Sequence, residues 1–389
     1  MPCCMDKILN REAREELLNQ LRLKYHTLSR REKAETINAL ILSTGYSRKA
    51  AIRALNKAAR DKPILKRQRR KPSRYDTILP GLRQIWKASN YLCGKRLHEA
   101  LPLYISRMSQ ASELHLTDSQ IDLLLTISAA TIDRLLRVDR SKVRPKGRCT
   151  TRPGSILLHQ IMVKTFAEWN DTKPGYFAMD WVAFCGESLQ GEFVYVLSMT
   201  DIATGWMALA AFMGRSEYAF TEAILTVMKS LPFALRGIHV DNDSTFINHH
   251  VYRFCLSNQI TMSRSRPNKN NDNCFVEQKN WDVVRKNLGY SRYDTQDQLA
   301  IIKQVLPLIE IYQNVFQPSM RLACKYRDGA KVHKTYRKAK APLQQLSEDK
   351  STPSELAYML QNLYADLSPL QLRKQIDALV TKLDKLPQK

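Results

Sequence analysis

The sequence lacks the cysteine patterns that would indicate a disulfide-stabilised or zinc-binding protein. Its eight cysteines include no CxxC pair, and no Cys/His set has the spacing of a zinc finger. This usage is typical of reduced thiols in an intracellular protein. No apolar run approaches the length of a transmembrane span, and the N-terminus lacks the charged-then-apolar layout of a signal peptide. We therefore expect a cytoplasmic protein without a membrane segment.

Acidic residues are scarce relative to basic ones. The 389 residues include 61 Lys and Arg but only 37 Asp and Glu, which gives a formal net charge of +24. Such an excess is costly in self-repulsion, and a polyanion is the usual compensating partner. The charge is also clustered, because residues 62–74 carry seven basic residues and no acid, and residues 137–152 carry seven against Asp139. The composition therefore predicts contact with a nucleic-acid backbone.

The first part of the chain is predicted to be helical. Ser29 and Glu32 form a capping box, the segment TGYS interrupts the helix, and Ser47 caps a second, basic helix. This order is typical of a helix-turn-helix unit that binds DNA, and equally of an ordinary helical hairpin. In the first interpretation, the residues near the start of the recognition helix are Arg48, Lys49 and Arg53.

A second helical region repeats this pattern. Thr117 and Gln120 form another capping box, and Ser128 begins a helix with basic side chains. The region is a plausible second helix-turn-helix, whose DNA contacts would be Arg134 and Arg137.

Residues from about Lys173 onward change to short apolar runs separated by turns. Three runs joined by short turns predict an antiparallel meander, and strands and helices then alternate. The order β-β-β-α-β-α-β-α predicts an α/β fold, a mixed sheet flanked by helices. The predicted organisation is a helix-turn-helix domain at 1–61, a basic linker at 62–74, a second helical domain at 75–136, a basic linker with a connecting helix at 137–172, the α/β core at 173–290, and a basic, largely helical region at 291–389.

Two aspartates stand at unusual places in the predicted strands. Asp180 interrupts the first apolar strand, and Asp241 ends the fourth. In a mixed sheet these two strands can lie side by side, which would bring the carboxylates together. Two close carboxylates repel each other, so one would be protonated unless a divalent cation neutralises them.

Glu277 is a third candidate, at the start of a helix expected to return across the sheet edge. On an α-helix its face would be shared by Trp281, Val284 and Leu288, with Lys279 and Lys286 on another face. A lone carboxylate leading an apolar stripe is costly unless a partner compensates it. Three carboxylates suit Mg²⁺ or Mn²⁺, and two such ions are usual for in-line displacement at a phosphodiester. Taken singly, each acid could instead cap a turn or complement a helix dipole.

Residues 173–290 resemble the integrase catalytic core of DDE transposases and retroviral-type integrases, which has a ribonuclease-H-like fold. Asp241 and Glu277 are separated by 35 residues, the spacing of that family's DD(35)E signature. The segments MTDIATGW, DNDSTFIN and NDNCFVEQKN also occur in the expected order. The whole chain resembles transposases of bacterial insertion sequences.

The resemblance implies that Asp180, Asp241 and Glu277 are catalytic residues and the ligands of two Mg²⁺ or Mn²⁺ ions. Asn242 and Lys279 match positions that lie near the site or the DNA, whereas Asp201 is expected to order its turn. The implied function is a transposase that binds the terminal inverted repeats of its element, cleaves there, and joins the ends to target DNA by 3′-OH attack. It would act on DNA as a homodimer or higher oligomer, associated with the bacterial nucleoid.

One residue departs from the family pattern. Asp243 stands where glycine is expected, and glycine there permits a positive φ and close approach of the backbone to DNA. The zinc module of retroviral integrases is also missing. Two alternatives therefore stay open: a ribonuclease-H-like nuclease that cleaves without joining, and a sequence-specific DNA-binding regulator with an inactive catalytic domain.

Overall fold

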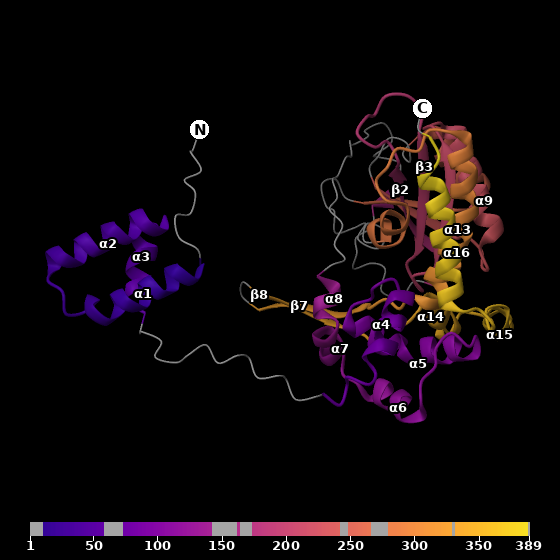
Figure 1. The fold of residues 1–389 in the computed structure, drawn as a ribbon. Coiled ribbons are helices and arrows are strands. Elements are labelled where there is room, and N and C mark those ends of the chain that lie inside the picture. The colour runs from indigo at the N-terminus through magenta and orange to yellow at the C-terminus, as the bar shows by residue number, and fades with distance from the viewer. Residues whose placement is uncertain are drawn as a thin grey trace. The chain divides into compact units, whose positions relative to one another are not determined.

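The computed structural model describes residues 11–57, 73–141, 162–163, 173–241, 248–265, 279–328 and 331–387. The chain divides into two compact units, Met1–Ser73 and Arg74–Lys389 (Figure 1).

The first unit contains the helices that the capping signals predicted. They are α1 (Arg11–Tyr25), α2 (Arg30–Thr44) and α3 (Arg48–Leu55). The Ser29 capping box is present, and the Ser47 side chain accepts a hydrogen bond from the Ala50 amide. Gly45 ends α2 with a φ of 70°, a left-handed conformation that glycine adopts without strain. The helices share a small core made by Leu18, Tyr25, Ile37, Leu40, Ala51 and Leu55.

The second unit is built on a mixed sheet. Its strands are β1 (Met162–Val163), β2 (Tyr176–Ala183), β3 (Val194–Asp201), β4 (Met207–Met213), β5 (Gly237–Val240) and β6 (Thr261–Arg264). They lie in the order β1-β6-β5-β2-β3-β4. The β2–β3 and β3–β4 pairs are antiparallel, whereas β2–β5, β5–β6 and β1–β6 are parallel.

Helices follow the strands in the predicted order. These are α9 (Glu217–Ser230), α10 (His249–Ser257), and the π-helix η3 (Asn280–Arg285), which continues into α12 (Lys286–Leu288). The β-β-β-α-β-α-β-α prediction is thus confirmed, and with it the mixed sheet flanked by helices. Because successive side chains of a strand point to opposite faces, the fully buried β3 contributes to two cores. Val194 and Val196 pack on one face, and Tyr195 and Leu197 on the other, with α9 and α10.

The second helical region packs in the same core as one face of the sheet. Its helices are α4 (Leu79–Ala88), α5 (Gly94–Gln110), α6 (Asp118–Thr126), α7 (Ala129–Leu135) and α8 (Arg137–Arg140). The predicted caps at Thr117 and Ser128 are both present.

Helix α13 (Gln296–Phe316) forms the centre of this core. It is the one helix in the described ranges that is long and apolar enough to cross a membrane, so the expectation of no such run was wrong by that criterion. Most of the apolar stretch of α13 is buried inside the protein, which is typical of a core helix. The Tyr312 hydroxyl donates to the Ala88 carbonyl at 2.6 Å, which joins α13 to α4.

Polar side chains of α13 also cover the edge strand β4. Asn314 accepts a hydrogen bond from the Met207 amide and donates one to the Met207 carbonyl, each at 2.8 Å. Glu310 accepts from the Leu209 amide at 2.5 Å. Burial raises the pKa of Glu310 to about 8, although the Leu209 hydrogen bond opposes the shift. These bonds satisfy backbone groups that an edge strand otherwise leaves open to another chain.

The C-terminal region, predicted to be largely helical, also contains two strands after α13. Residues 318–342 contain an antiparallel hairpin of β7 (Leu322–Asp328) and β8 (Lys331–Tyr336). It is followed by α14 (Pro342–Glu348), α15 (Ser354–Leu363) and α16 (Pro369–Asp384), and α16 packs along α13 (Figure 1).

The connecting helix expected within 137–172 falls mainly outside the described residues. Of the residues described there, Arg137–Arg140 form α8, and Met162 and Val163 form strand β1, which pairs with β6. A strand at this position was not predicted, because two residues are too few for a period-two pattern.

Candidate active site

Asp180 and Asp241 lie on neighbouring central strands, near the end of the sheet where β5 finishes. We call this end of the sheet the carboxylate edge. Strands β2 and β5 are parallel neighbours, and their last registered pair is Ala178 with His239. Asp180 lies two residues after Ala178 within β2, and Asp241 lies two residues after His239, directly after the end of β5. The two aspartates are therefore expected to face the same side of the sheet. Both are half-buried. The prediction that the first and fourth strands lie side by side is confirmed.

The chain segment that follows Glu277 contacts Asp180. Asn280, the first residue of η3, donates a hydrogen bond from Nδ2 to Oδ2 of Asp180 at 2.5 Å. The other carboxylate oxygen of Asp180 accepts from the Trp181 amide at 2.8 Å. Glu277 itself lies outside the described residues, three positions before Asn280, as do Asn242 and Asp243.

The apolar stripe predicted behind Glu277 is only partly correct. Val284 and Leu288 are buried, but Trp281 is 47% exposed. The stripe assumed α-helical spacing, whereas Asn280–Arg285 form a π-helix, whose wider turn rotates side chains away from the i, i+4, i+7 face. Lys286, which was expected on a different face from this stripe, donates from its ammonium to the Asn90 carbonyl and is largely covered.

A buried histidine beside this edge has another role. His239 Nδ1 lies 3.1 Å from the Ser263 hydroxyl, and Nε2 lies 3.2 Å from the Ser265 hydroxyl. Both ring nitrogens are therefore engaged with β6 and the residue after it. His239 is accordingly a structural residue of the sheet. The metal ligands predicted from the sequence are carboxylates and do not include it.

The residues at this edge fit a hard divalent cation. Carboxylate and amide oxygens are the ligands that Mg²⁺ and Mn²⁺ prefer. Asn280 Oδ1 is buried and accepts no hydrogen bond from any described residue, which leaves an amide oxygen beside Asp180 for a further partner. Within the described ranges no group of three His, Cys, Asp or Glu side chains could hold a metal ion. The third predicted ligand, Glu277, lies outside those ranges.

Lys279 stands among several charged side chains next to this edge. Its pKa is lowered to about 8, mainly by burial and also by the neighbouring Arg96 and Arg321, while Asp282 opposes the shift. A half-buried cation with two cationic neighbours would gain from a nearby anion such as a phosphate.

Asp201 orders its turn, as expected. One carboxylate oxygen accepts from the Thr204 amide and hydroxyl, both at 2.7 Å, and the other accepts from the Gly175 amide at 2.8 Å. Burial raises the pKa of Asp201 to about 6, against these hydrogen bonds. It stands opposite Phe177, at the start of β2 rather than at the edge with Asp241.

The predicted DNA-contacting residues on the helices before the sheet are exposed. Arg48, Lys49 and Arg53 lie on the surface of α3. Arg134 lies on α7 and donates to the Thr131 hydroxyl at 3.3 Å, whereas Arg137 begins the short helix α8 instead of continuing α7. Their contact with DNA stays a prediction.

Sequence reasoning missed the β7–β8 hairpin as a candidate surface. Tyr326 stacks on His333 across the two strands, with ring centroids 4.9 Å apart, and Lys334 and Arg337 are exposed. The signal in the sequence was the pair Gly329-Ala330, since a Gly-X pair between two strand-forming segments predicts a tight hairpin.

Comparisons with known proteins agree with this geometry. A family model described as the integrase core domain matches residues 171–270. The protein y4rM of Sinorhizobium fredii is 35% identical over 340 residues, which cover 87% of this chain and 96% of that protein.

The crystal structure of the catalytic core domain of BIV integrase is also similar, with 15% identity and a TM-score of 0.29. The match covers 37% of this chain and 86% of that one. A TM-score this low supports no conclusion about function. From the y4rM relationship and the integrase core model, the protein belongs to the family of y4rM and carries the ribonuclease-H-like integrase core of the transposases and integrases.

Proposed function

We propose that the protein is a DNA transposase that binds the terminal inverted repeats of its own element, cleaves at the element ends and joins them to target DNA. The observation that carries this proposal is the meeting of three segments at one sheet edge. Strands β2 and β5 run in parallel toward Asp180 and Asp241, and Asn280 ties the segment after Glu277 to Asp180.

Asp180, Asp241 and Glu277 would hold two Mg²⁺ or Mn²⁺ ions. Bound ions would neutralise the carboxylates and the charge that develops on the phosphodiester. The donor chemistry supports this assignment, because the side chains at the edge offer oxygen and the adjacent His239 is engaged with two serines. Asn280 would orient Asp180 through their hydrogen bond, as partners of metal-ligating carboxylates do.

The proposed chemistry has two displacements at phosphorus. In end cleavage, a bond to a water oxygen forms, the bond to the 3′ oxygen breaks, and that oxygen takes up a proton to give a 3′-OH and a 5′-phosphate. In strand transfer, this 3′-OH attacks a target phosphodiester and releases another 3′-OH. The second step exchanges one phosphate ester for another, so it requires no energy-rich co-reactant.

DNA would be bound at several places along the chain. Exposed basic residues of α3, α7 and α8 support end recognition, with Arg48, Lys49, Arg53, Arg134 and Arg137 as the contacts. Asn242 and Lys279 would contact DNA near the carboxylates. Because two element ends have to be joined in one complex, the working form would be a homodimer or a higher oligomer.

The test is a joining assay with labelled double-stranded oligonucleotides from the candidate inverted repeats, Mg²⁺ and a supercoiled plasmid. Sequencing of the joints should show element 3′ ends linked to plasmid DNA for the natural protein, and none for Asp180→Asn or Asp241→Asn. The matched control is Glu355→Gln, which removes one exposed carboxylate on α15.

Each alternative gives a different result in this assay. Cleaved ends without joints would indicate a nuclease. Specific end binding without cleavage, unchanged by the aspartate substitutions, would indicate a DNA-binding regulator.

A further inference from the structure

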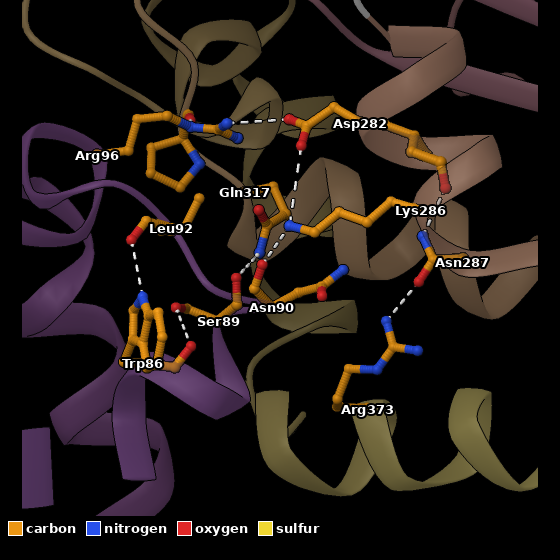
Figure 2. A network of polar contacts seen from close by, with 12 residues as sticks. Trp86, Ser89, Asn90, Leu92, Arg96, Asp282, Lys286, Asn287, Gln317 and Arg373 are labelled. Atoms are coloured by element: carbon orange, nitrogen blue, oxygen red, sulfur yellow. Dashed lines mark hydrogen bonds and ion pairs between the residues drawn. The ribbon is translucent and has the colours of Figure 1, made fainter. Parts of the chain in front are cut away.

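Residues 280–288, which form η3 and α12, are bound by an arginine of α5, a helix that is not part of the integrase core. Arg96 Nη1 donates to Oδ2 of Asp282 on η3 at 2.9 Å, and Arg96 Nε donates to the Pro318 carbonyl at 2.6 Å (Figure 2). The side chains of Arg96 and Asp282 are 18% and 28% exposed. A planar guanidinium with two partners in different segments fixes their relative positions more tightly than a single exposed ion pair would.

Two further contacts hold the same segment. Lys286 donates to the Asn90 carbonyl, and its ammonium lies 4.0 Å from Asp282. Arg373 of α16 donates to Oδ1 of Asn287 at 2.5 Å (Figure 2). Burial alone would raise the pKa of Asp282, but Arg96 and Lys286 outweigh it and lower the pKa below its usual value. Asp282 is therefore a paired carboxylate at the centre of these contacts.

The loop that carries Asn90 and leads to Arg96 is itself fixed by α7 and α8. Asp133 accepts hydrogen bonds from the Gly94 amide at 2.7 Å and from Arg140 at 2.5 Å, and Arg140 also donates to the Leu92 carbonyl at 3.1 Å. A Cβ on Gly94 would stand 2.3 Å from the Ala129 carbonyl oxygen, so glycine is required for this close packing of α5 on α7.

A π-helix needs such support more than an α-helix does. Its backbone geometry is less favourable, so π-helical turns are short and persist where the surroundings hold them. In this chain the π-helix η3 begins at Asn280, which contacts Asp180, and it contains Asp282, which contacts Arg96. A shift of η3 would therefore change the position of Asn280 relative to Asp180.

We propose that Arg96 is a positioning residue, which holds η3, and with it the Asn280–Asp180 hydrogen bond, in place through its ion pair with Asp282. The inference rests on the proposed transposase function for its effect on catalysis. Its structural part concerns η3 alone. Arg96 comes from the second helical region, outside residues 171–270 that match the integrase core.

The experiment compares the full-length natural protein with Arg96→Gln, Arg96→Lys and Arg83→Gln. Arg83 is the matched control, because it forms an ion pair of the same length, 2.9 Å, and its partner is Asp139 of α8 rather than a residue of η3. Two readouts are measured: hydrogen exchange of amides in residues 280–288, and the single-turnover rate of end cleavage at saturating end DNA with Mg²⁺.

Arg96→Gln should speed exchange in 280–288 and lower the single-turnover rate by about tenfold or more, the usual worth of a charge-assisted hydrogen bond. Affinity for end DNA should equal that of Arg83→Gln. Arg96→Lys should recover part of both losses, because an ammonium can pair with Asp282 but cannot make both contacts of the guanidinium.

The proposal is overturned if Arg96→Gln matches Arg83→Gln in both readouts, or if only DNA affinity falls. Faster exchange with an unchanged rate would also overturn the positioning role. If instead the natural protein and Glu277→Gln are both inactive on every end DNA, the transposase function fails. Hydrogen exchange then still decides whether Arg96 holds η3.

Discussion

Asn280 and Asp180 are joined by a 2.5 Å hydrogen bond that connects η3 to the central strand β2 across 100 residues of sequence. This bond brings the segment that follows Glu277 to the edge where Asp180 and Asp241 lie. It also leaves Asn280 Oδ1 buried and without a hydrogen bond from the described residues. The amide nitrogen of Asn280 is thus bonded to the carboxylate, whereas its buried amide oxygen is available for a further partner.

Asn280→Ala should destabilise the protein and lower its activity. Loss of a hydrogen bond to a charged group costs about 1.5–3 kcal/mol, and loss of an outer-shell partner costs roughly 10–100-fold in metal affinity or activity. Urea unfolding and the joining assay measure the two effects. Asn258→Ala, which removes an exposed side chain bonded to the Phe254 carbonyl, is the control. Equal behaviour of the two variants would show that the Asn280–Asp180 bond has no special role.

Arg48 and Lys49 should read the element ends. The double substitution to alanine removes two exposed cations from the start of α3, and we expect a loss of about 1–3 kcal/mol per base-contacting side chain for end DNA. Arg30→Ala with Arg31→Ala removes the same charge from the exposed start of α2 and serves as the control. Competition gel shifts with end and scrambled DNA give the specificity ratio. A ratio reduced equally by both double variants would mean that the effect is only electrostatic.

DNA binding should weaken steeply with salt. A net charge of +24 and the basic stretches at 62–74, 137–152 and 318–342 indicate many phosphate contacts. Six to ten such contacts lose roughly 10³–10⁵ in affinity between about 50 and 200 mM salt. Fluorescence anisotropy across a salt titration measures the slope. A nearly flat line would show that the positive charge serves another partner.

Glu310→Gln should make the protein more stable at alkaline pH. Burial raises the folded-state pKa of Glu310 from 4.5 to about 8. Between these values the folded state holds a proton that the unfolded state releases, so the stability contributed by Glu310 falls as pH rises. The glutamine keeps the oxygen that accepts from the Leu209 amide but does not titrate. The gain in melting temperature over the natural protein should therefore grow from about pH 4.5 to about pH 8 and then level off. A gain independent of pH would contradict the raised pKa.

Strands and helix caps were predictable because their signals are local. Apolar runs and turns predicted the order of strands and helices along the chain, and Ser29, Thr117 and Ser128 cap helices where the sequence places them. The adjacency of Asp180 and Asp241 required a guess about strand order, which the parallel pairing of β2 with β5 confirms.

The features that sequence missed depend on tertiary contacts. The predicted stripe assumed α-helical spacing, whereas Asn280–Arg285 form a π-helix, so the exposure of Trp281 could not be read from that spacing. The contact of Lys286 with the Asn90 carbonyl could not be predicted, because Asn90 lies 196 residues away in the chain. The β7–β8 hairpin was obscured by its many basic residues, which resemble a linker by composition.

Glu277→Gln tests the central claim most directly. Glutamine keeps the size and helix propensity of glutamate but loses the charge that would hold a divalent cation opposite Asp180 and Asp241. If Glu277 only complements the helix dipole, the change should cost about 0.3–1 kcal/mol and leave catalysis intact.

The measurement is end cleavage and joining at equal folded concentration, with end-DNA affinity and melting temperature recorded beside it. We predict that both reactions fall by more than the roughly 10–100-fold expected for an outer-shell partner, while affinity and melting temperature stay close to those of the natural protein. A Glu277→Gln protein that joins ends at the natural rate would contradict the three-carboxylate site.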